Sequence, residues 1–213
     1  MSELGFEVLN IQPDAHAVSP TLTIRLRIDE TTGERVHAIA LRAQVRIDAQ
    51  RRRYTDAERA GLVDLFGEPS RWGRSVKPFL WTQCSTMVQG FQSSTEADLP
   101  MPVSYDFEVS AAKYLHALSG GDVALSLSFF GTVFSRGSTG FAVSQIPWHH
   151  DLDYRMPVDV WHKLVEHHYP DTGWLRLEHD TIAALQRFKS ERGLLNHDQA
   201  CAVLLAEAGG GPQ

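Results

Sequence analysis

The segment Thr21-Leu-Thr-Ile-Arg-Leu-Arg-Ile28 decides the fold class, because apolar and polar residues alternate along it without a break. Successive side chains of a β-strand point to opposite faces, so this alternation predicts a strand with one buried and one solvated face. Residues 39–48, Ile-Ala-Leu-Arg-Ala-Gln-Val-Arg-Ile-Asp, repeat the pattern. The intervening segment 29–34 contains a glycine among polar residues and is predicted to be a hairpin loop that pairs the two strands.

Five further segments are predicted to be strands. They are residues 6–11, 79–88, 99–110, 123–134 and 141–146. Pro100 and Pro102 indicate either a sheet edge or a late entry into the sheet for the third of them, because proline has no N–H to donate to a neighbouring strand. The small residues of 135–140 predict a tight reversal between the last two. Seven strands with one polar face each pack most simply as a two-layer antiparallel β-sandwich.

Helices are predicted as short insertions and as a C-terminal group. Thr55-Asp-Ala-Glu58 matches a capping box, which starts a helix that Gly67 can end. The other predicted helices cover residues 111–118, 157–169, 180–191 and 197–206. The predicted class is therefore α+β. An antiparallel β-sandwich of about seven strands with two short helices is expected over residues 1–150, a C-terminal helical appendage packed on it over 151–208, and a flexible tail over 209–213.

Composition narrows the classes of function. The chain has 213 residues, 43% of them hydrophobic, and a net charge of -6, which disfavours binding to nucleic acid or to an anionic membrane surface. Cys84 and Cys201 do not form a metal-binding or disulfide-framework spacing. The N-terminus lacks the features of a signal peptide, and no apolar run reaches the roughly 20 residues of a membrane span. We therefore expect a cytoplasmic protein.

Catalytic and cofactor motifs are missing from the sequence. It contains neither the glycine-rich dinucleotide fingerprint nor a P-loop, and Gly137-Ser-Thr-Gly140 is too short for a nucleophile elbow. His162 and Glu166 approach an inverted zinc-protease motif, but one extra residue separates them. We accordingly expect a protein that is not an enzyme and carries no cofactor.

A histidine and aspartate cluster offers an alternative function as a nickel or zinc carrier or sensor. Its residues are His149, His150, Asp151 and Asp153. Imidazole suits nickel and zinc, and carboxylates can complete such a site. Adjacent side chains usually diverge, however, so the same residues also suit a polar connector after the last predicted strand.

Arginines on the two regular strands suggest a protein partner. If the strands pair through the loop at 29–34, their polar faces coincide and bring together Arg25, Arg27, Arg42 and Arg46. Four guanidinium groups on one surface would favour a partner with an acidic surface. An ordinary solvated strand face is the alternative interpretation.

An ordered series of short motifs resembles a bacterial family of unknown function that is encoded beside the genes of high-affinity nickel-iron hydrogenases in high-GC Gram-positive bacteria. The series comprises Arg52-Arg53-Tyr54, Leu65-Phe66-Gly67, Tyr105-Asp106, Lys113-Tyr114, 131–134, 146–148, Pro157-Val158, Trp161, Tyr169-Pro170 and 174–177. The resemblance spans residues 6 to about 205 and supplies no catalytic residues. It implies a non-enzymatic accessory protein in hydrogenase assembly or maturation.

Overall fold

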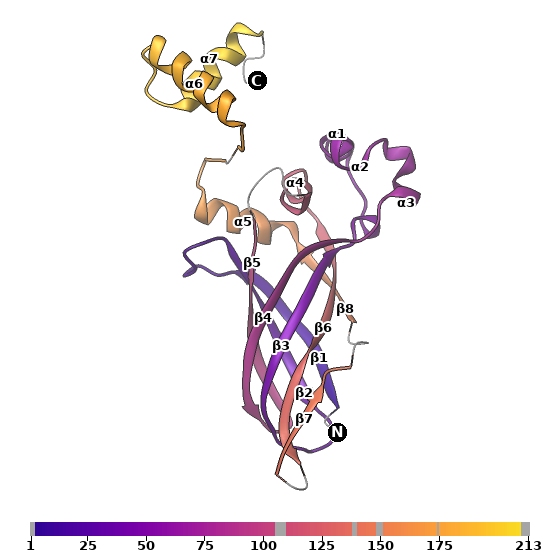
Figure 1. The fold of residues 1–213 in the computed structure, drawn as a ribbon. Helices are drawn as coiled ribbons and strands as arrows, with labels where there is room; N and C mark the ends of the chain where they lie inside the picture. The colour runs from indigo at the N-terminus through magenta and orange to yellow at the C-terminus, as the bar shows by residue number, and fades with distance from the viewer. Residues whose placement is uncertain (1–2, 105–109, 138–139, 148–150, 174, 210–213) are drawn as a thin grey trace. The chain divides into compact units, whose positions relative to one another are not determined.

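Eight antiparallel strands form two sheets in the computed structural model, which describes residues 3–104, 110–137, 140–147, 151–173 and 175–209. One sheet has the order β1-β2-β5, and the other has the order β4-β3-β6-β7 with β8 also paired to β6 (Figure 1). The bounds are β1 Leu4–Pro13, β2 Thr21–Glu30, β3 Val36–Ile47, β4 Phe79–Phe91, β5 Ser94–Pro102, β6 Asp122–Gly137, β7 Gly140–Gln145 and β8 Asp151–Pro157. The predicted α+β class with a sandwich-like arrangement is confirmed.

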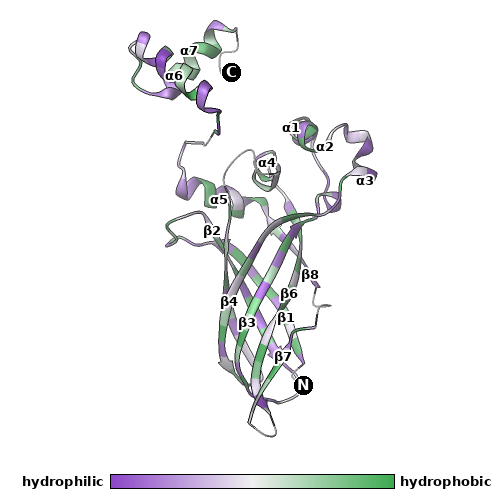
Figure 2. Ribbon diagram, viewed as in Figure 1, coloured by the Kyte–Doolittle hydropathy of each residue, from purple (hydrophilic) through white to green (hydrophobic). Residues whose placement is uncertain are grey.

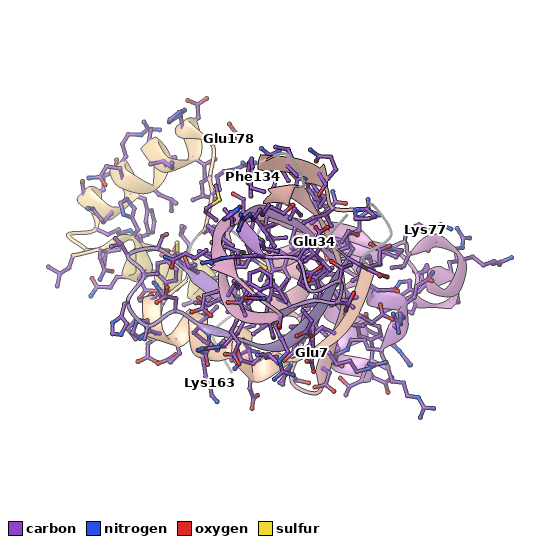
Figure 3. All side chains as sticks on the ribbon, turned by 90° about the horizontal axis from the view of Figure 1, so that it is seen from below. Glu7, Glu34, Lys77, Phe134, Lys163 and Glu178 are labelled. Atoms are coloured by element: carbon purple, nitrogen blue, oxygen red, sulfur yellow. The ribbon has the colours of Figure 1, made fainter. Side chains whose placement is uncertain are left out.

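Alternating side chains build the core between the sheets. Leu22, Ile24, Leu26 and Ile28 of β2 are completely buried, whereas Arg25 and Arg27 between them are exposed. Hydrophobic and hydrophilic residues also alternate along β3 (Figure 2). Side chains fill the space between the sheets when the strands are viewed end on (Figure 3). Phe6 of β1 stacks on Phe129 of β6, with ring centroids 4.9 Å apart.

The predicted pairing of β2 with β3 is wrong. β2 pairs with β1 and β5, whereas β3 pairs with β4 and β6. Residues 31–35 therefore carry the chain from one sheet to the other instead of closing a hairpin. The period of two determines which face of a strand is buried, but it does not determine the neighbouring strand.

Short helices gather at one end of the strands (Figure 1). They are η1 Ala49–Arg51, α1 Asp56–Gly61, α2 Val63–Phe66, η2 Pro69–Arg71, α3 Trp72–Ser75, α4 Ser110–His116 and α5 Val158–His168. The predicted capping box is confirmed: the Glu58 N–H donates to the Thr55 hydroxyl, and the Thr55 N–H donates to the Glu58 carboxylate. Gly67 ends α2 with a positive φ of 71°, as its position in the sequence predicts.

The chain divides into two compact units, residues 1–174 and 175–213. β8 and α5 thus belong to the unit that contains the sheets, although residues 151–169 were expected in the C-terminal appendage. The second unit consists of α6, His179–Glu191, and α7, His197–Glu207, which begins with Asn196 as its N-cap. Among the helices that the structure describes, none combines the length and the apolar composition needed to span a bilayer.

Candidate functional site

The four arginines expected on one surface lie on two different sheets. Arg25 and Arg27 belong to β2 in the three-stranded sheet, and Arg42 and Arg46 belong to β3 in the other sheet. All four are exposed. The structure therefore divides the predicted cluster into two pairs, because strand pairing separates the polar faces of β2 and β3.

The two pairs also differ in charge compensation. Arg25 Nε lies 3.0 Å from the Glu96 carboxylate, and Arg27 Nη1 lies 2.9 Å from the Glu7 carboxylate. Arg42 and Arg46 have no carboxylate within 4 Å among the described residues. Across the strands Arg42 faces Ser85 and Phe130, and Arg46 faces Leu80 and Ser126. Their positive charges are therefore more available to a partner.

The predicted metal ligands are described only in part. His149 and His150 lie outside the described residues, so the metal-carrier alternative stays a prediction. Asp151 and Asp153 begin β8, and Asp153 forms an ion pair with Arg51 at 2.7 Å. No group of three or more metal-ligating side chains occurs in the part of the chain that the structure describes.

An arginine-rich surface, which the sequence did not predict as a site, lies where β3 runs into η1 and α1. Two hollows of about 430 and 450 Å³ adjoin there and share Gln50, Arg52 and Arg53. We call the first the aromatic hollow and the second the polar hollow. Among the described residues, five arginines, namely Arg51, Arg52, Arg53, Arg59 and Arg155, and a single acidic residue, Asp122, line the two hollows.

Aromatic rings form the inner wall of the aromatic hollow. Tyr54 and Trp72 meet edge to face with centroids 5.3 Å apart, and Phe66 meets Trp72 at 5.4 Å. The Trp72 indole N–H donates to the Gly67 carbonyl over 2.8 Å. The Tyr54 hydroxyl lies 2.9 Å from that of Tyr114 and donates to the Ala49 carbonyl. The polar atoms of these rings are thus engaged within the protein, which leaves apolar ring surface toward the hollow.

A buried ion pair holds the arginine-rich surface together. Arg52 Nη2 lies 2.7 Å from Glu58 Oε1, and the two side chains are 7% and 3% exposed. Arg52 also donates to the carbonyls of Gly120 and Asp122, and Glu58 accepts from the Ser119 N–H. The pair therefore fastens the start of α1 to the turn before β6. We call this arrangement the Arg52–Glu58 clasp.

Electrostatics keeps Glu58 ionised inside the clasp. Burial opposes its ionisation, but hydrogen bonds from the Thr55 and Ser119 N–H groups and the charge of Arg52 together hold the pKa of Glu58 below its ordinary value. The charge of Arg52 is consequently compensated within the protein. Arg52 is a structural residue of the surface.

The remaining arginines differ in how much of their charge is compensated. Arg51 is paired with Asp153, and Arg59 makes an exposed contact of 3.3 Å with Asp56. Arg155 donates to the Arg51 carbonyl, which leaves its charge without a carboxylate partner among the described residues. Arg53 is exposed and lines both hollows. Arg53 and Arg155 are therefore the strongest candidates for contacting an anionic group.

Cys84 and Tyr114 are buried in the core. Burial raises the pKa of Cys84 to about 12, so its thiol is protonated at neutral pH. Burial and the neighbouring Tyr54 raise the pKa of the completely buried Tyr114. These groups contribute to packing and hydrogen bonding, as predicted for Cys84.

The sequence contained part of the signal for this surface. Arg51, Arg52 and Arg53 are consecutive, and residues 1–78 hold 12 of the 20 basic side chains in an acidic chain. Arg155, however, arrives from β8, about 100 residues later. A local pattern can show the run of three arginines but cannot show that a fourth joins it.

Comparisons with known proteins identify a family and no function. The model of a family described as a family of unknown function, DUF6084, matches residues 1–212. No curated protein sequence matches the chain. A structure assigned as ApaA from Bordetella pertussis shares 10% identity over 73% of this chain and 94% of that one, with a TM-score of 0.29. β-Glucosidase 3B from Thermotoga neapolitana shares 17% identity over 72% of this chain and 17% of that one, with a TM-score of 0.27.

Proposed function

This chain belongs to the DUF6084 family, and we propose that it is a non-enzymatic interaction protein that docks an acidic segment of a partner protein on its arginine-rich surface. One observation carries the proposal: among the described residues of a protein whose net charge is -6, five arginines and a single acidic residue line two adjoining hollows, and two of these arginines, Arg53 and Arg155, have no carboxylate partner. A local concentration of positive charge on an acidic protein favours association with an anionic surface.

The outer face of β3 extends the proposed docking surface. Arg46 is the last outward residue of β3 before η1, and its cross-strand neighbour Ser126 pairs in turn with Asp153 of β8. Arg42 lies on the same face of β3, four residues before Arg46 and farther from the helical end. We therefore retain Arg42 and Arg46 in the proposed partner surface, together with Arg53 and Arg155.

The guanidinium groups suit carboxylates in particular. An arginine presents its donors in a planar fork that matches both oxygens of a carboxylate. The clasp holds the backbone on either side of Arg53 in place, since it ties α1 to the turn at residues 119–122. A fixed surface loses little conformational entropy on binding.

The family resemblance supplies the proposed setting. We propose that the acidic partner is a component of nickel-iron hydrogenase assembly and that the chain assists that assembly by docking. This part of the proposal rests on the gene context that the resemblance implies, whereas the docking chemistry rests on the arginine-rich surface.

A direct binding experiment tests the proposal. The purified chain would be measured by biolayer interferometry against purified hydrogenase subunits encoded beside its gene, at about 0.1 M and about 1 M salt. We expect Arg53→Glu combined with Arg155→Glu to slow association at least tenfold at low salt. The matched control is Arg27→Glu combined with Arg25→Glu, which reverses two charges on the other sheet.

Three results would count against the proposal. The electrostatic mechanism would be refuted if the association rate changed neither with the double charge reversal nor with the salt concentration. An equal effect of the control variant would show that net charge acts without a defined surface. Absence of binding to every hydrogenase subunit would remove the proposed setting.

A further inference from the structure

The aromatic hollow contains apolar ring surface, and charge attraction to an acidic partner does not involve this surface. Its inner wall contains Tyr54, Phe66 and Trp72, and Arg53 and Arg59 stand among its other lining residues. In the part of the chain that the structure describes, no aromatic residue lines the polar hollow beside it. The two hollows therefore differ in the chemistry that they can recognise, although they share Arg52 and Arg53.

We propose that the aromatic hollow binds an aromatic side chain of the partner's acidic segment, while Arg53 and Arg59 hold the carboxylates on either side of it. This inference rests on the proposed docking function and specifies the chemistry of the partner. The occupant is an acidic peptide segment with one aromatic residue flanked by Asp or Glu.

The wall of the hollow suits an apolar group because its polar atoms already have partners. Trp72 Nε1 donates to the Gly67 carbonyl, and the Tyr54 hydroxyl bonds within the protein. The Gln50 amide N–H group donates to the Trp72 and Val76 carbonyls. An aromatic ring placed against this wall gains contact with ring faces and edges.

The size and preorganisation of the hollow support the same occupant. Its volume of about 430 Å³ falls in the range of pockets that hold small organic groups. Trp72 is 9% exposed and packs against both Tyr54 and Phe66, so the wall is fixed before binding. Aromatic anchors in fixed pockets commonly dominate the energy of protein interfaces.

Two arginines at the rim of the hollow can donate hydrogen bonds to the carboxylates of the partner's segment. Arg53 is exposed and has no carboxylate partner among the described residues. Arg59 forms an ion pair with the fully exposed Asp56, an interaction that an incoming carboxylate can replace at small cost. An aromatic residue flanked by acidic residues would therefore pack against the aromatic wall and form ion pairs with Arg53 and Arg59 at the same time.

Three capped peptides test the inference by isothermal titration calorimetry with the full chain. They have the one-letter sequences DEFED, DEAED and NQFQN, so they separate the aromatic ring from the charge. We expect DEFED to bind about tenfold more tightly than either of the others. Arg53→Glu should weaken DEFED and DEAED together.

A steric variant localises the aromatic preference. Ser70 is an exposed lining residue of the hollow, so Ser70→Trp places an indole in the space that the ligand ring would take. We expect this variant to bind DEFED no better than DEAED while retaining its affinity for DEAED. The control is Ser190→Trp, which adds the same side chain to an exposed position of α6.

The outcomes separate the two proposals. Equal binding of DEFED and DEAED, or an unchanged preference in Ser70→Trp, would overturn the aromatic subsite and leave acidic docking intact. Binding of NQFQN as tight as that of DEFED would overturn the role of the flanking carboxylates. Failure of both acidic peptides to bind would count against the docking function itself.

Discussion

Replacing Glu58 by glutamine should destabilise the protein by about 3 kcal/mol, because it removes the negative charge from the Arg52–Glu58 clasp. Both side chains are almost completely buried, so solvent screens the interaction little. Removing one partner from a buried ion pair typically costs about 3 to 5 kcal/mol. Arg52 would keep its hydrogen bonds to the Gly120 and Asp122 carbonyls, which places the cost at the lower end of that range.

Urea unfolding followed by circular dichroism measures this change. A loss of about 3 kcal/mol corresponds to a fall in Tm of roughly 6 to 12 °C for a unit of this size. Glu96→Gln is the matched control, because it removes the same charge from the exposed pair with Arg25 and should cost less than about 1 kcal/mol. A double variant, Glu58→Gln with Arg52→Met, should be more stable than the sum of the single effects predicts.

Two results would refute this reasoning. The clasp would not be a stabilising unit if Glu58→Gln changed the free energy of unfolding by less than about 0.5 kcal/mol. Strict additivity of the two single substitutions would show that Arg52 and Glu58 stabilise the chain independently.

The same carboxyl makes stability depend on pH. Since the pKa of Glu58 lies below its ordinary value of 4.5 in the folded protein, the folded state binds this proton less readily than the unfolded state. Its stabilisation is complete above about pH 4.5 and is lost as the pH falls through the folded-state pKa. The difference in unfolding free energy between wild type and Glu58→Gln should therefore shrink below pH 4.5, and a constant difference would contradict the assignment.

Two other predictions concern the core. Gly131 has a φ of 151°, and a Cβ there would lie 2.1 Å from the Ala40 carbonyl oxygen, so Gly131→Ala should lower stability by about 3 kcal/mol or more in urea unfolding. A wild-type-like midpoint would show that β6 can move away from β3. Burial and a pKa of about 12 should prevent Cys84 from reacting with a thiol reagent at pH 8 until urea unfolds the chain, whereas partly exposed Cys201 reacts at once. Rapid titration of two thiols in the folded protein would contradict this.

Local patterns predicted most strands but not their order. The alternation over residues 21–28 reflects burial of one face, which is a property of the segment itself and identified β2 correctly. The neighbours of β2 depend on how residues 31–35 cross between the sheets. The alternation of residues within a strand carries no information about that crossing. The edge position of β5 was predictable, because Pro100 and Pro102 lack the N–H that an inner strand needs.

β8 was missed although its signal is present in the sequence. Leu152, Tyr154 and Met156 alternate with exposed residues, and Met156 is completely buried. The adjacent histidines and aspartates instead favoured a metal site or a polar connector over a strand. This strand brings Arg155 to the arginine-rich surface, so missing it also concealed the site.

Along one short segment, the clasp distinguishes a structural arginine from an arginine that we propose contacts the partner. Arg52 is turned into the protein, where Glu58 and two backbone carbonyls satisfy it, whereas Arg53 is exposed at both hollows. Charge reversal at Arg52 would therefore place two negative charges together in a buried site and unfold the surface. Charge reversal at Arg53 meets no such constraint. Substitutions of these adjacent arginines therefore separate binding from stability. Charge reversal at Arg53 should weaken binding without lowering stability, whereas charge reversal at Arg52 should always lower stability.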